Sequence, residues 1–404
     1  MPIRLLLPAG VDRSVLPLLA GKALRSYVDG FVAVLLPAYL LALGFETLDV
    51  GFVSTATLLG SALATLAIGA WGHRFAHRRL LSGAALLMLA TGLAFASLSA
   101  FWPLIVVACV GTLNPSAGDV SVFLPLEQAR LAAASQAEAR TALFARYALL
   151  GDLFAALGAL SSGLPLWIAA LAGAAPLQGM RAMFVLYGLM GGVLWLLYRR
   201  GAAPAPDPQA GPPAPLTRSR RVVLRLALLF SVDSFASGLA INALMALWLF
   251  RRFDLSLAAT GTFFFWTGLL SAGSQLLAPR VARRIGLVNT MVFTHIPANL
   301  CLIAAAFAPQ FEVALGLLLV RALLSRMDVP VRSALVMAVV TPGERAAAAS
   351  FTAVPRSLAS AIGPTLGAGL FALGWLAAPL VACGALKIAY DLALWQGFRD
   401  HRID

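Results

Sequence analysis

Apolar residues fill long stretches of the chain, which charged clusters and Gly or Pro residues separate. About 20 mostly apolar residues are needed to cross ~30 Å of hydrocarbon as a helix. Twelve stretches have this length, and each is predicted to form one membrane-spanning helix. Their approximate limits are 16–43, 49–71, 80–100, 102–126, 141–163, 180–198, 222–249, 257–279, 287–308, 312–339, 346–373 and 375–397.

The composition also predicts an all-α membrane protein. Of the 404 residues, 60% are hydrophobic and only 12% are charged, whereas a soluble domain carries roughly 25% charged residues. This deficit of charge indicates lipid as the solvent and argues against a cytosolic enzyme. The three cysteines stand singly in apolar runs, so their spacing predicts neither a disulfide framework nor a metal site.

The distribution of arginine predicts the orientation in the membrane. The chain has 28 Arg, 2 Lys and a formal net charge of +13. Nineteen arginines fall in segments on the side of the N-terminus, and three, Arg181, Arg251 and Arg252, fall on the other side. Cytoplasmic loops of membrane proteins are enriched in Lys and Arg. We therefore expect both termini in the cytoplasm, the chain in a cell inner membrane, and no nucleic-acid partner.

A linker divides the chain into two halves. The segment 201–217 contains six prolines and no run that could form a packed core, which is typical of an extended linker. We therefore expect an N-terminal six-helix bundle over 1–198, a cytoplasmic Pro-rich linker over 199–221, and a C-terminal six-helix bundle over 222–404.

Short matches recur across this linker at offsets of 204, 209 and 206. The aligned pairs are Asp29 with Asp233, Asp119 with Asp328, and Glu138 with Glu344. Three matches in the same order at a nearly constant offset indicate a duplicated six-helix unit, as transporter folds often contain.

The twelve spans, the duplication and a basic loop between the second and third spans resemble the major facilitator superfamily. The loop signature of that family has a Gly, an Asp four residues on, an Arg and a basic cluster. Here Gly69, Arg74, Arg78 and Arg79 match it, and His73 stands where the family has Asp. The resemblance covers essentially the whole chain and assigns no subfamily. It implies two pseudo-symmetric six-helix bundles, with spans 1, 4, 7 and 10 lining a central cavity.

Five carboxylates fall well inside the predicted spans, and four of them lie on the spans that line the cavity in the resembled fold. The five are Asp29, Asp119, Asp152, Asp233 and Asp328. An ionised group at mid-bilayer costs roughly 2.5–3.5 kcal/mol, so it is expected to face a cavity or a partner.

The tenth predicted span carries a polar stripe. Arg321, Ser325, Asp328 and Arg332 follow a 4-3-4 spacing, which places them on one face of a continuous helix. Span 4 repeats the spacing with Thr112, Ser116, Asp119 and Phe123. Because guanidinium groups bind carboxylate or phosphate, Arg321 and Arg332 are candidates for binding an anionic substrate. The alternative is that both arginines only neutralise Asp328.

Other charged residues are predicted to form structural ion pairs. Short loops bring Asp119 towards Arg146 and Asp328 towards Arg356, and Lys387 lies four residues before Asp391. Arg25 lies one turn before Asp29. His295, with Asn299 one turn on, is expected to be a satisfied core histidine, and His73 and His77 belong to a solvated basic loop.

Asp29 and Asp233 are the candidates for proton coupling. No cation lies within one turn of Asp233 in the sequence. Desolvation disfavours the charged form of a carboxyl, so a carboxyl in a dry site exchanges its proton near neutral pH. The alternative for both residues is a hydrogen bond between helices.

These features favour a secondary active transporter that moves a small solute by alternating access. Proton-coupled efflux is expected, the direction by analogy with facilitators of this size and short-loop form. A carrier for an organic or inorganic anion is the alternative. A polytopic membrane sensor or enzyme is the alternative from another class, but no signalling domain and no clustered catalytic site are visible. We expect a monomer without metal or cofactor, and its partners are the small-molecule substrate, protons and the lipid bilayer.

Overall fold

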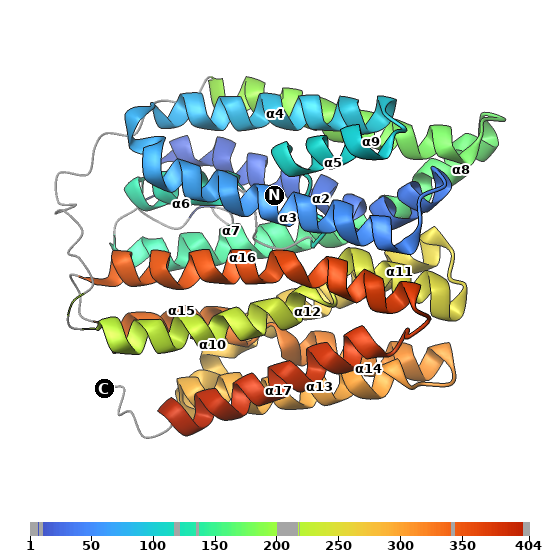
Figure 1. Ribbon diagram of the computed structural model, residues 1–404. Coiled ribbons are helices and arrows are strands. Elements are labelled where there is room, and N and C mark those ends of the chain that lie inside the picture. The colour runs from blue at the N-terminus through green and yellow to red at the C-terminus, as the bar shows by residue number, and fades with distance from the viewer. Residues whose placement is uncertain are drawn as a thin grey trace. The chain divides into compact units, whose positions relative to one another are not determined.

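The computed structural model describes residues 7, 11–116, 122–134, 137–199, 217, 219–340 and 344–398. Over these residues the regular structure is entirely helical (Figure 1). The chain packs as two compact units. One comprises Met1–Glu46, Phe52–Gln209 and Leu255–Phe265, and the other comprises Thr47–Gly51, Ala210–Asp254 and Trp266–Asp404.

The helices follow the predicted spans closely at most of their ends. Those up to the linker are η1 (Arg13–Val15), α2 (Leu16–Ala42), α3 (Thr47–Trp71), η2 (Gly72–Arg74), α4 (His77–Ser97), α5 (Phe101–Val110), α6 (Phe123–Ala133), α7 (Ala137–Leu160), η3 (Ser161–Gly163), α8 (Leu164–Leu171) and α9 (Pro176–Arg199). Those after it are α10 (Arg220–Gly238), α11 (Asn242–Phe253), α12 (Leu257–Ile285), α13 (Leu287–Ala306), α14 (Phe311–Ser325), α15 (Asp328–Val339), α16 (Arg345–Ala372) and α17 (Ala378–Phe398).

Eight helical segments in the described part of the chain are long and apolar enough to cross a membrane. They correspond to predicted spans 1, 2, 3, 5, 6, 7, 9 and 12. Predicted spans 8 and 11 are α12 and α16, of 29 and 28 residues, which have the length but are less apolar. The fold is that of a multi-pass, all-helical membrane protein.

Predicted spans 4 and 10 are not single helices. Span 10 is divided between α14 and α15, because Pro330 lies in the first turn of α15 and has no N–H to donate to the carbonyl of residue 326. In span 4, α5 ends at Val110 and the non-helical stretch that follows contains Asn114 and Pro115. Spans 4 and 10 are counterparts across the repeat. Span 7 is also divided, between α10, which ends at Gly238, and α11, which begins at Asn242.

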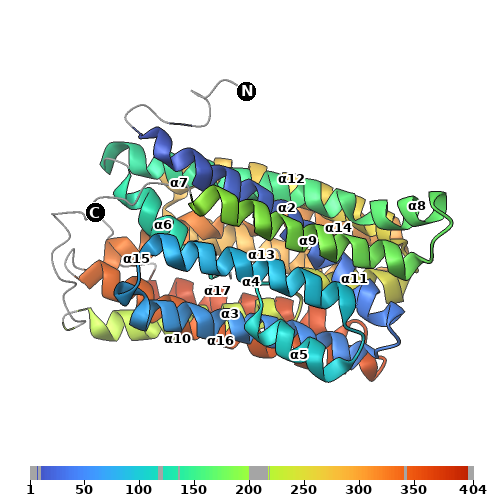
Figure 2. The ribbon, with the colours of Figure 1, turned by 90° about the horizontal axis from the view of Figure 1, so that it is seen from above.

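The same helix pairs form the main packing contacts within each unit. The first unit is built on α2 against α7 and α4 against α9, and the second on α10 against α16 and α13 against α17 (Figures 1 and 2). In span numbers, both units pair their first helix with their fifth and their third with their sixth. This shared pairing agrees with the duplication that the offsets indicate.

Glycines allow the first and fifth helices of each unit to touch. A Cβ atom on Gly30 of α2 would overlap the carbonyl oxygen of Ala155, and one on Gly158 of α7 would overlap that of Tyr27. In the second unit a Cβ on Gly363 of α16 would overlap the backbone of Gly238. Small residues at such crossings let helices in a membrane approach closely enough to gain van der Waals contact.

Two of these helices end in the same hydrogen-bonded turn. Gly44 after α2 and Gly374 after α16 have φ of 90° and 83°, a left-handed conformation that glycine adopts without strain. Phe45 N–H donates to the Leu40 carbonyl at 3.1 Å, and Trp375 N–H donates to that of Leu370 at 3.0 Å. Both are the six-residue bond of the Schellman motif, which satisfies a carbonyl at the helix end.

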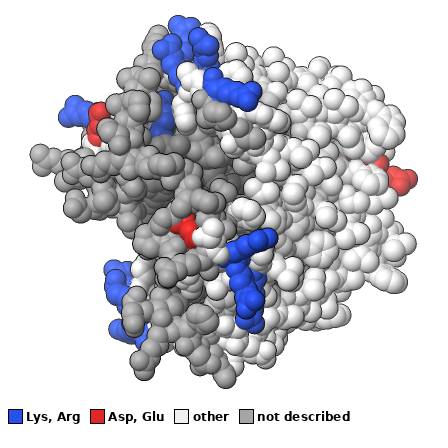
Figure 3. Space-filling model, turned by 60° about the vertical axis from the view of Figure 1, so that its left-hand side comes forward, with Lys and Arg blue, Asp and Glu red and all other residues white. Residues whose placement is uncertain are grey.

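The outer surface carries many large apolar side chains. Trp102, Leu171, Leu228 and Leu373 are each more than 65% exposed. On the face drawn in Figure 3, a broad area has no charged side chain, and the Lys, Arg, Asp and Glu side chains lie towards the edges of that area. In water this exposed apolar area would favour aggregation, whereas in a bilayer it contacts lipid.

Candidate functional site

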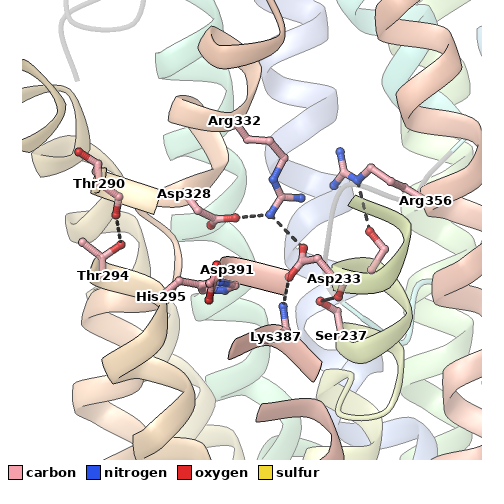
Figure 4. A network of polar contacts seen from close by, with 11 residues as sticks. Asp233, Ser237, Thr290, Thr294, His295, Asp328, Arg332, Arg356, Lys387 and Asp391 are labelled. Atoms are coloured by element: carbon pink, nitrogen blue, oxygen red, sulfur yellow. Dashed lines mark hydrogen bonds and ion pairs between the residues drawn. The ribbon is translucent and has the colours of Figure 1, made fainter. Parts of the chain in front are cut away.

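The second unit encloses a cluster of charged side chains centred on Asp233 of α10 (Figure 4). Lys387 Nζ of α17 lies 2.7 Å from Asp233 Oδ1, and Arg332 Nη2 of α15 lies 3.0 Å from Oδ2. Asp233 is 2% exposed. Both cations that bind Asp233 come from other helices, so neither lies within one turn of it in the sequence.

Arg332 joins two carboxylates. Its Nη2 also forms an ion pair with Asp328, four residues earlier on α15, and its guanidinium lies over the ring of Phe230 at 5.4 Å from the centroid. Arg332 therefore ties the start of α15 to α10. Its Nε is buried and has no hydrogen-bond partner among the described residues.

The prediction that Lys387 pairs with Asp391 is wrong. Lys387 binds Asp233 instead, and Asp391 lies 3.1 Å from Nδ1 of His295 on α13 (Figure 4). The i, i+4 spacing brings the two α17 residues to one face, but each binds a partner on a neighbouring helix. His295 was expected to be a buried histidine with its hydrogen bonds satisfied, and its Nδ1 does have a partner. That partner, the Asp391 carboxylate, was not predicted from the sequence.

The predicted pair of Asp328 with Arg356 does not form either. Arg356 of α16 donates from Nε to Ser234 Oγ at 3.2 Å, and its guanidinium lies 5.9 Å from the Phe230 centroid. Asp328 is already paired with Arg332. Arg356 thus borders the cluster without an ion pair that the structure shows.

The polar stripe of span 10 is divided by the helix break. Arg321 and Ser325 lie on α14, whereas Asp328 and Arg332 lie on α15, so the prediction of four residues on one continuous helical face is wrong. Arg321 Nε is buried without a hydrogen-bond partner in the described residues. The thiols of Cys383 and Cys301 and the guanidinium of Arg326 act on its charge.

The first unit contains a different charged cluster, centred on Glu127 of α6. Arg25 of α2 donates from Nη1 to Oε1 at 2.6 Å and from Nη2 to Oε2 at 2.9 Å. Tyr198 of α9 donates to Oε1 at 2.6 Å, and Tyr147 of α7 donates to Oε2. Glu127 is fully buried, so four donors from three helices compensate its charge.

Glu127 is the functional-site candidate that the sequence did not reveal. It lies one residue beyond the predicted end of span 4 and therefore looked like part of a loop. The predicted partner of Arg25 was Asp29, one turn away on the same helix. A bidentate bond to a carboxylate on another helix is stronger, because both guanidinium donors are used.

Asp29 is left with incomplete compensation. It is 7% exposed, and its Oδ1 has no hydrogen-bond partner in the part of the chain that the structure describes. The charges of Arg25 and Lys22, both earlier on α2, act on it, but Arg25 is bound to Glu127. Asp29 is therefore a buried carboxylate with a free acceptor atom.

The remaining candidates have separate locations. Asp119 lies outside the described residues, as does the side chain of His73, and Ser116 donates from Oγ to Asn114 Oδ1 at 2.7 Å. Arg146 of α7 has a buried Nη1 that lacks a hydrogen-bond partner among the residues described. The predicted 2–3 loop extends from Gly69 near the end of α3, through η2 with Arg74, to Arg78 and Arg79 on α4.

The two clusters use opposite charges at related places. In the first unit the helix of span 1 supplies the cation, Arg25, and the second half of span 4 supplies the acid, Glu127. In the second unit the helix of span 7 supplies the acid, Asp233, and the second half of span 10 supplies the cation, Arg332. The duplicated framework is the same, and the charges on it differ. Within the described residues no group of His, Cys, Asp and Glu is arranged to hold a metal ion.

Comparison with known proteins assigns the family. Residues 18–325 match the model of the Major Facilitator Superfamily. An uncharacterized membrane protein of Saccharomyces cerevisiae, YJR124C, is 25% identical over an alignment of 418 positions that covers 95% of this chain and 93% of that protein. The D-xylose-proton symporter structure has a TM-score of 0.73 at 14% identity and covers 96% of this chain and 99% of its own.

The structure of a bacterial homologue of the iron transporter ferroportin, in an inward-facing state, also has a TM-score of 0.73, at 17% identity. The match covers 95% of this chain and 98% of the homologue. At such low identity these structures establish the fold alone. The family match covers more than half of the sequence. The chain belongs to the Major Facilitator Superfamily and is a multi-pass membrane protein with the fold of a transporter.

Proposed function

We propose that the chain is a secondary active transporter that exports a small solute across the inner membrane and is driven by protons. In this proposal the transporter works by alternating access, in which movement of the two bundles, 1–198 and 222–404, exposes the solute to one side of the membrane at a time. Both termini and the linker lie in the cytoplasm, as the excess of arginine on that side favours. The transporter functions as a monomer and needs no cofactor.

The observation that carries the proton coupling is that Asp29 Oδ1 has no hydrogen-bond partner among the described residues. A buried carboxylate oxygen without a partner costs free energy, and binding a proton removes the charge. Asp233, its counterpart in the repeat, has two cations within 3.0 Å. In our proposal Asp29 therefore binds and releases the coupling proton, and Asp233 stays ionised as the anchor of the second cluster.

Two further points support this function. The D-xylose-proton symporter has the same fold and, by its name, couples its sugar to protons. The fold therefore accommodates proton coupling, although at 14% identity the likeness does not extend to the substrate. Export rests on analogy with facilitators of similar size and short loops.

An anion carrier is the second candidate, and Arg321 favours it. Its buried Nε lacks a protein partner among the residues described, and a guanidinium that has no carboxylate of its own is suited to binding one from a substrate. Arg332 is less suited to this role than the sequence suggested, because Asp233 and Asp328 already occupy it.

A proton-flux assay tests the coupling. The purified full-length chain is placed in liposomes that contain a pH-sensitive dye, and labelled D-xylose, ferrous iron, succinate or a lipophilic cation is added as the probe. We expect at least one transported probe to move protons with the parent protein and none with Asp29→Asn. A probe that crosses with the parent protein without any proton movement contradicts coupling, and transport of succinate alone favours the anion carrier.

A further inference from the structure

The second unit contains a pair of titratable groups that the proposed function does not use. His295 Nδ1 and Asp391 Oδ1 lie 3.1 Å apart, and both side chains are buried (Figure 4). Asp391 Oδ2 has no hydrogen-bond partner among the described residues, and neither has the hydroxyl of the adjacent Tyr390. The pair is thus isolated from water and incompletely compensated.

Among the described residues, the Asp391 carboxylate forms an ion pair with the His295 imidazole alone. The charges of His295, Asp233 and Lys387 act on Asp391. The Lys387 ammonium is bound to Asp233 at 2.7 Å, so these two charges cancel. With a neutral imidazole, Asp391 would keep an uncompensated negative charge in the interior, which is strongly unfavourable. One proton shared by His295 and Asp391 makes the group neutral, whichever of the two residues carries it.

The surrounding helices supply few other charges to this pair. The charges of Asp328 and Asp233 both interact with His295. Arg332 is bound to both of these acids. The ring of Tyr390 lies edge-on to the His295 ring, with the centroids 6.5 Å apart. Other cations on adjacent helices include Arg356 of α16, which is bonded to Ser234, Arg225 of α10, which lies over the Phe398 ring, and Arg321 of α14, whose charge the thiols of Cys301 and Cys383 affect.

Lys387 can reach a second partner. It lies four residues before Asp391 on α17, so both side chains share a face of that helix. Lysine has a flexible four-carbon stem that can move its ammonium between nearby acceptors. While the His295–Asp391 pair holds its proton, Asp391 attracts Lys387 only weakly, and the ammonium binds Asp233, as in this structure.

We propose that His295 and Asp391 form a proton-binding site that determines which carboxylate Lys387 binds. Loss of the proton leaves Asp391 charged, and Lys387 moves from Asp233 to Asp391. This move breaks the ion pair between α17 and α10, and Asp233 is then held by Arg332 alone. For its role in the transport cycle, this inference rests on the proposed proton-coupled transport. The helix that Lys387 releases, α10, is the helix of span 7, which lines the cavity in this family's fold.

The balance of the step is simple. One N–H or O–H bond of the pair breaks and its proton passes to water, one ammonium exchanges one carboxylate for another, and no bond between heavy atoms changes. The exchange predicts opposite effects for two substitutions. Removing the cation with Lys387→Met leaves deprotonated Asp391 without its new partner, so the proton is held more tightly. Removing the competing acid with Asp233→Asn leaves Lys387 free for Asp391, so the proton is released more easily.

Infrared difference spectroscopy between acidic and alkaline pH measures this release on the purified full-length chain in lipid nanodiscs, without substrate or gradient. The carboxyl and imidazole bands of the pair are identified by their loss in Asp391→Asn and His295→Gln. We expect the pH of release to rise by about one unit or more in Lys387→Met and to fall by a similar amount in Asp233→Asn, each a tenfold change in proton affinity. Lys22→Met, which removes the other lysine of the chain, is the matched control and leaves the release unchanged.

Shifts in the same direction for both variants, no shift in either, or no titration of the pair in the parent protein would overturn the proposal. Lys387→Gln replaces Lys387→Met if the latter fails to fold. The spectra need no transport, so they separate the two proposals. Normal opposite shifts with no proton-coupled transport would contradict the proposed function only, and coupled transport without these shifts would contradict only the role of His295 and Asp391.

Discussion

Arg25 of α2 binds Glu127 of α6 through both terminal guanidinium nitrogens, at 2.6 and 2.9 Å. This bond fixes the second half of a broken span against the first helix of its unit. Tyr147 and Tyr198 add donors from α7 and α9. Four helices of the first unit, α2, α6, α7 and α9, therefore meet at one buried carboxylate.

We predict that Arg25→Met destabilises the protein by about 3–5 kcal/mol, because it leaves the buried charge of Glu127 without its cation. The double variant Arg25→Met/Glu127→Leu should recover much of that loss, since neither charge remains. Thermal unfolding of the detergent-solubilised protein measures both. Arg181→Met, which removes an arginine hydrogen-bonded to an exposed Ser99, serves as the control. Equal midpoints for Arg25→Met and the control would show that the bond does not stabilise the unit.

A second prediction concerns the contact of α2 with α7. Gly158→Val should sharply reduce the yield of folded protein, because its side chain would overlap the Tyr27 carbonyl and overpacking costs typically 1–3 kcal/mol or more. Gly192→Val is the matched control, since nothing lies within 4 Å of a Cβ at that helical glycine. Fluorescence-detected size exclusion compares the two. A similar loss in both would mean that the close approach of α2 and α7 is not required.

A third prediction tests anion recognition. Arg321→Lys keeps the charge but loses the planar fork of donors, so an anion carrier should lose most of its succinate transport while remaining folded and inserted. Arg326→Lys, at the end of the same helix, is the control and should transport normally. Unchanged succinate transport by Arg321→Lys would exclude a bidentate role for this residue.

A fourth prediction concerns the orientation. A reporter that is active only in the cytoplasm should be active when fused within 201–217 and silent when fused near 45–48, because cytoplasmic loops of membrane proteins are enriched in Lys and Arg. The opposite pattern would reverse the orientation and the direction of every proposed step.

The sequence predicted the helices better than their breaks. Length and hydropathy locate spans such as α2 and α9 because the cost of exposing backbone in lipid forces long continuous helices. The interruption between α14 and α15 depends on the missing N–H of Pro330. An apolar window of twenty residues averages over a single proline and does not detect its effect.

The partners of the buried charges were harder to predict than the charges themselves. Asp233 and Lys387 were each recognised from the sequence, but their bond joins residues 154 apart in the chain. Local spacing favoured Lys387 with Asp391 and Arg25 with Asp29, and tertiary packing provides better partners for both cations. Glu127 was missed because its helix continues beyond the apolar stretch, to Ala133.

The central claim is that a proton on Asp29 drives transport, and accumulation of a labelled probe in proteoliposomes under an imposed pH gradient tests it most directly. With a probe that the parent protein concentrates against its gradient, Asp29→Asn should abolish accumulation while downhill exchange remains measurable, because Asn keeps the shape but cannot titrate. Asp49→Asn, which removes an acid at the start of α3, is the control and should accumulate the probe normally. If Asp29→Asn accumulates the probe as the parent protein does, the proposed coupling at Asp29 is wrong.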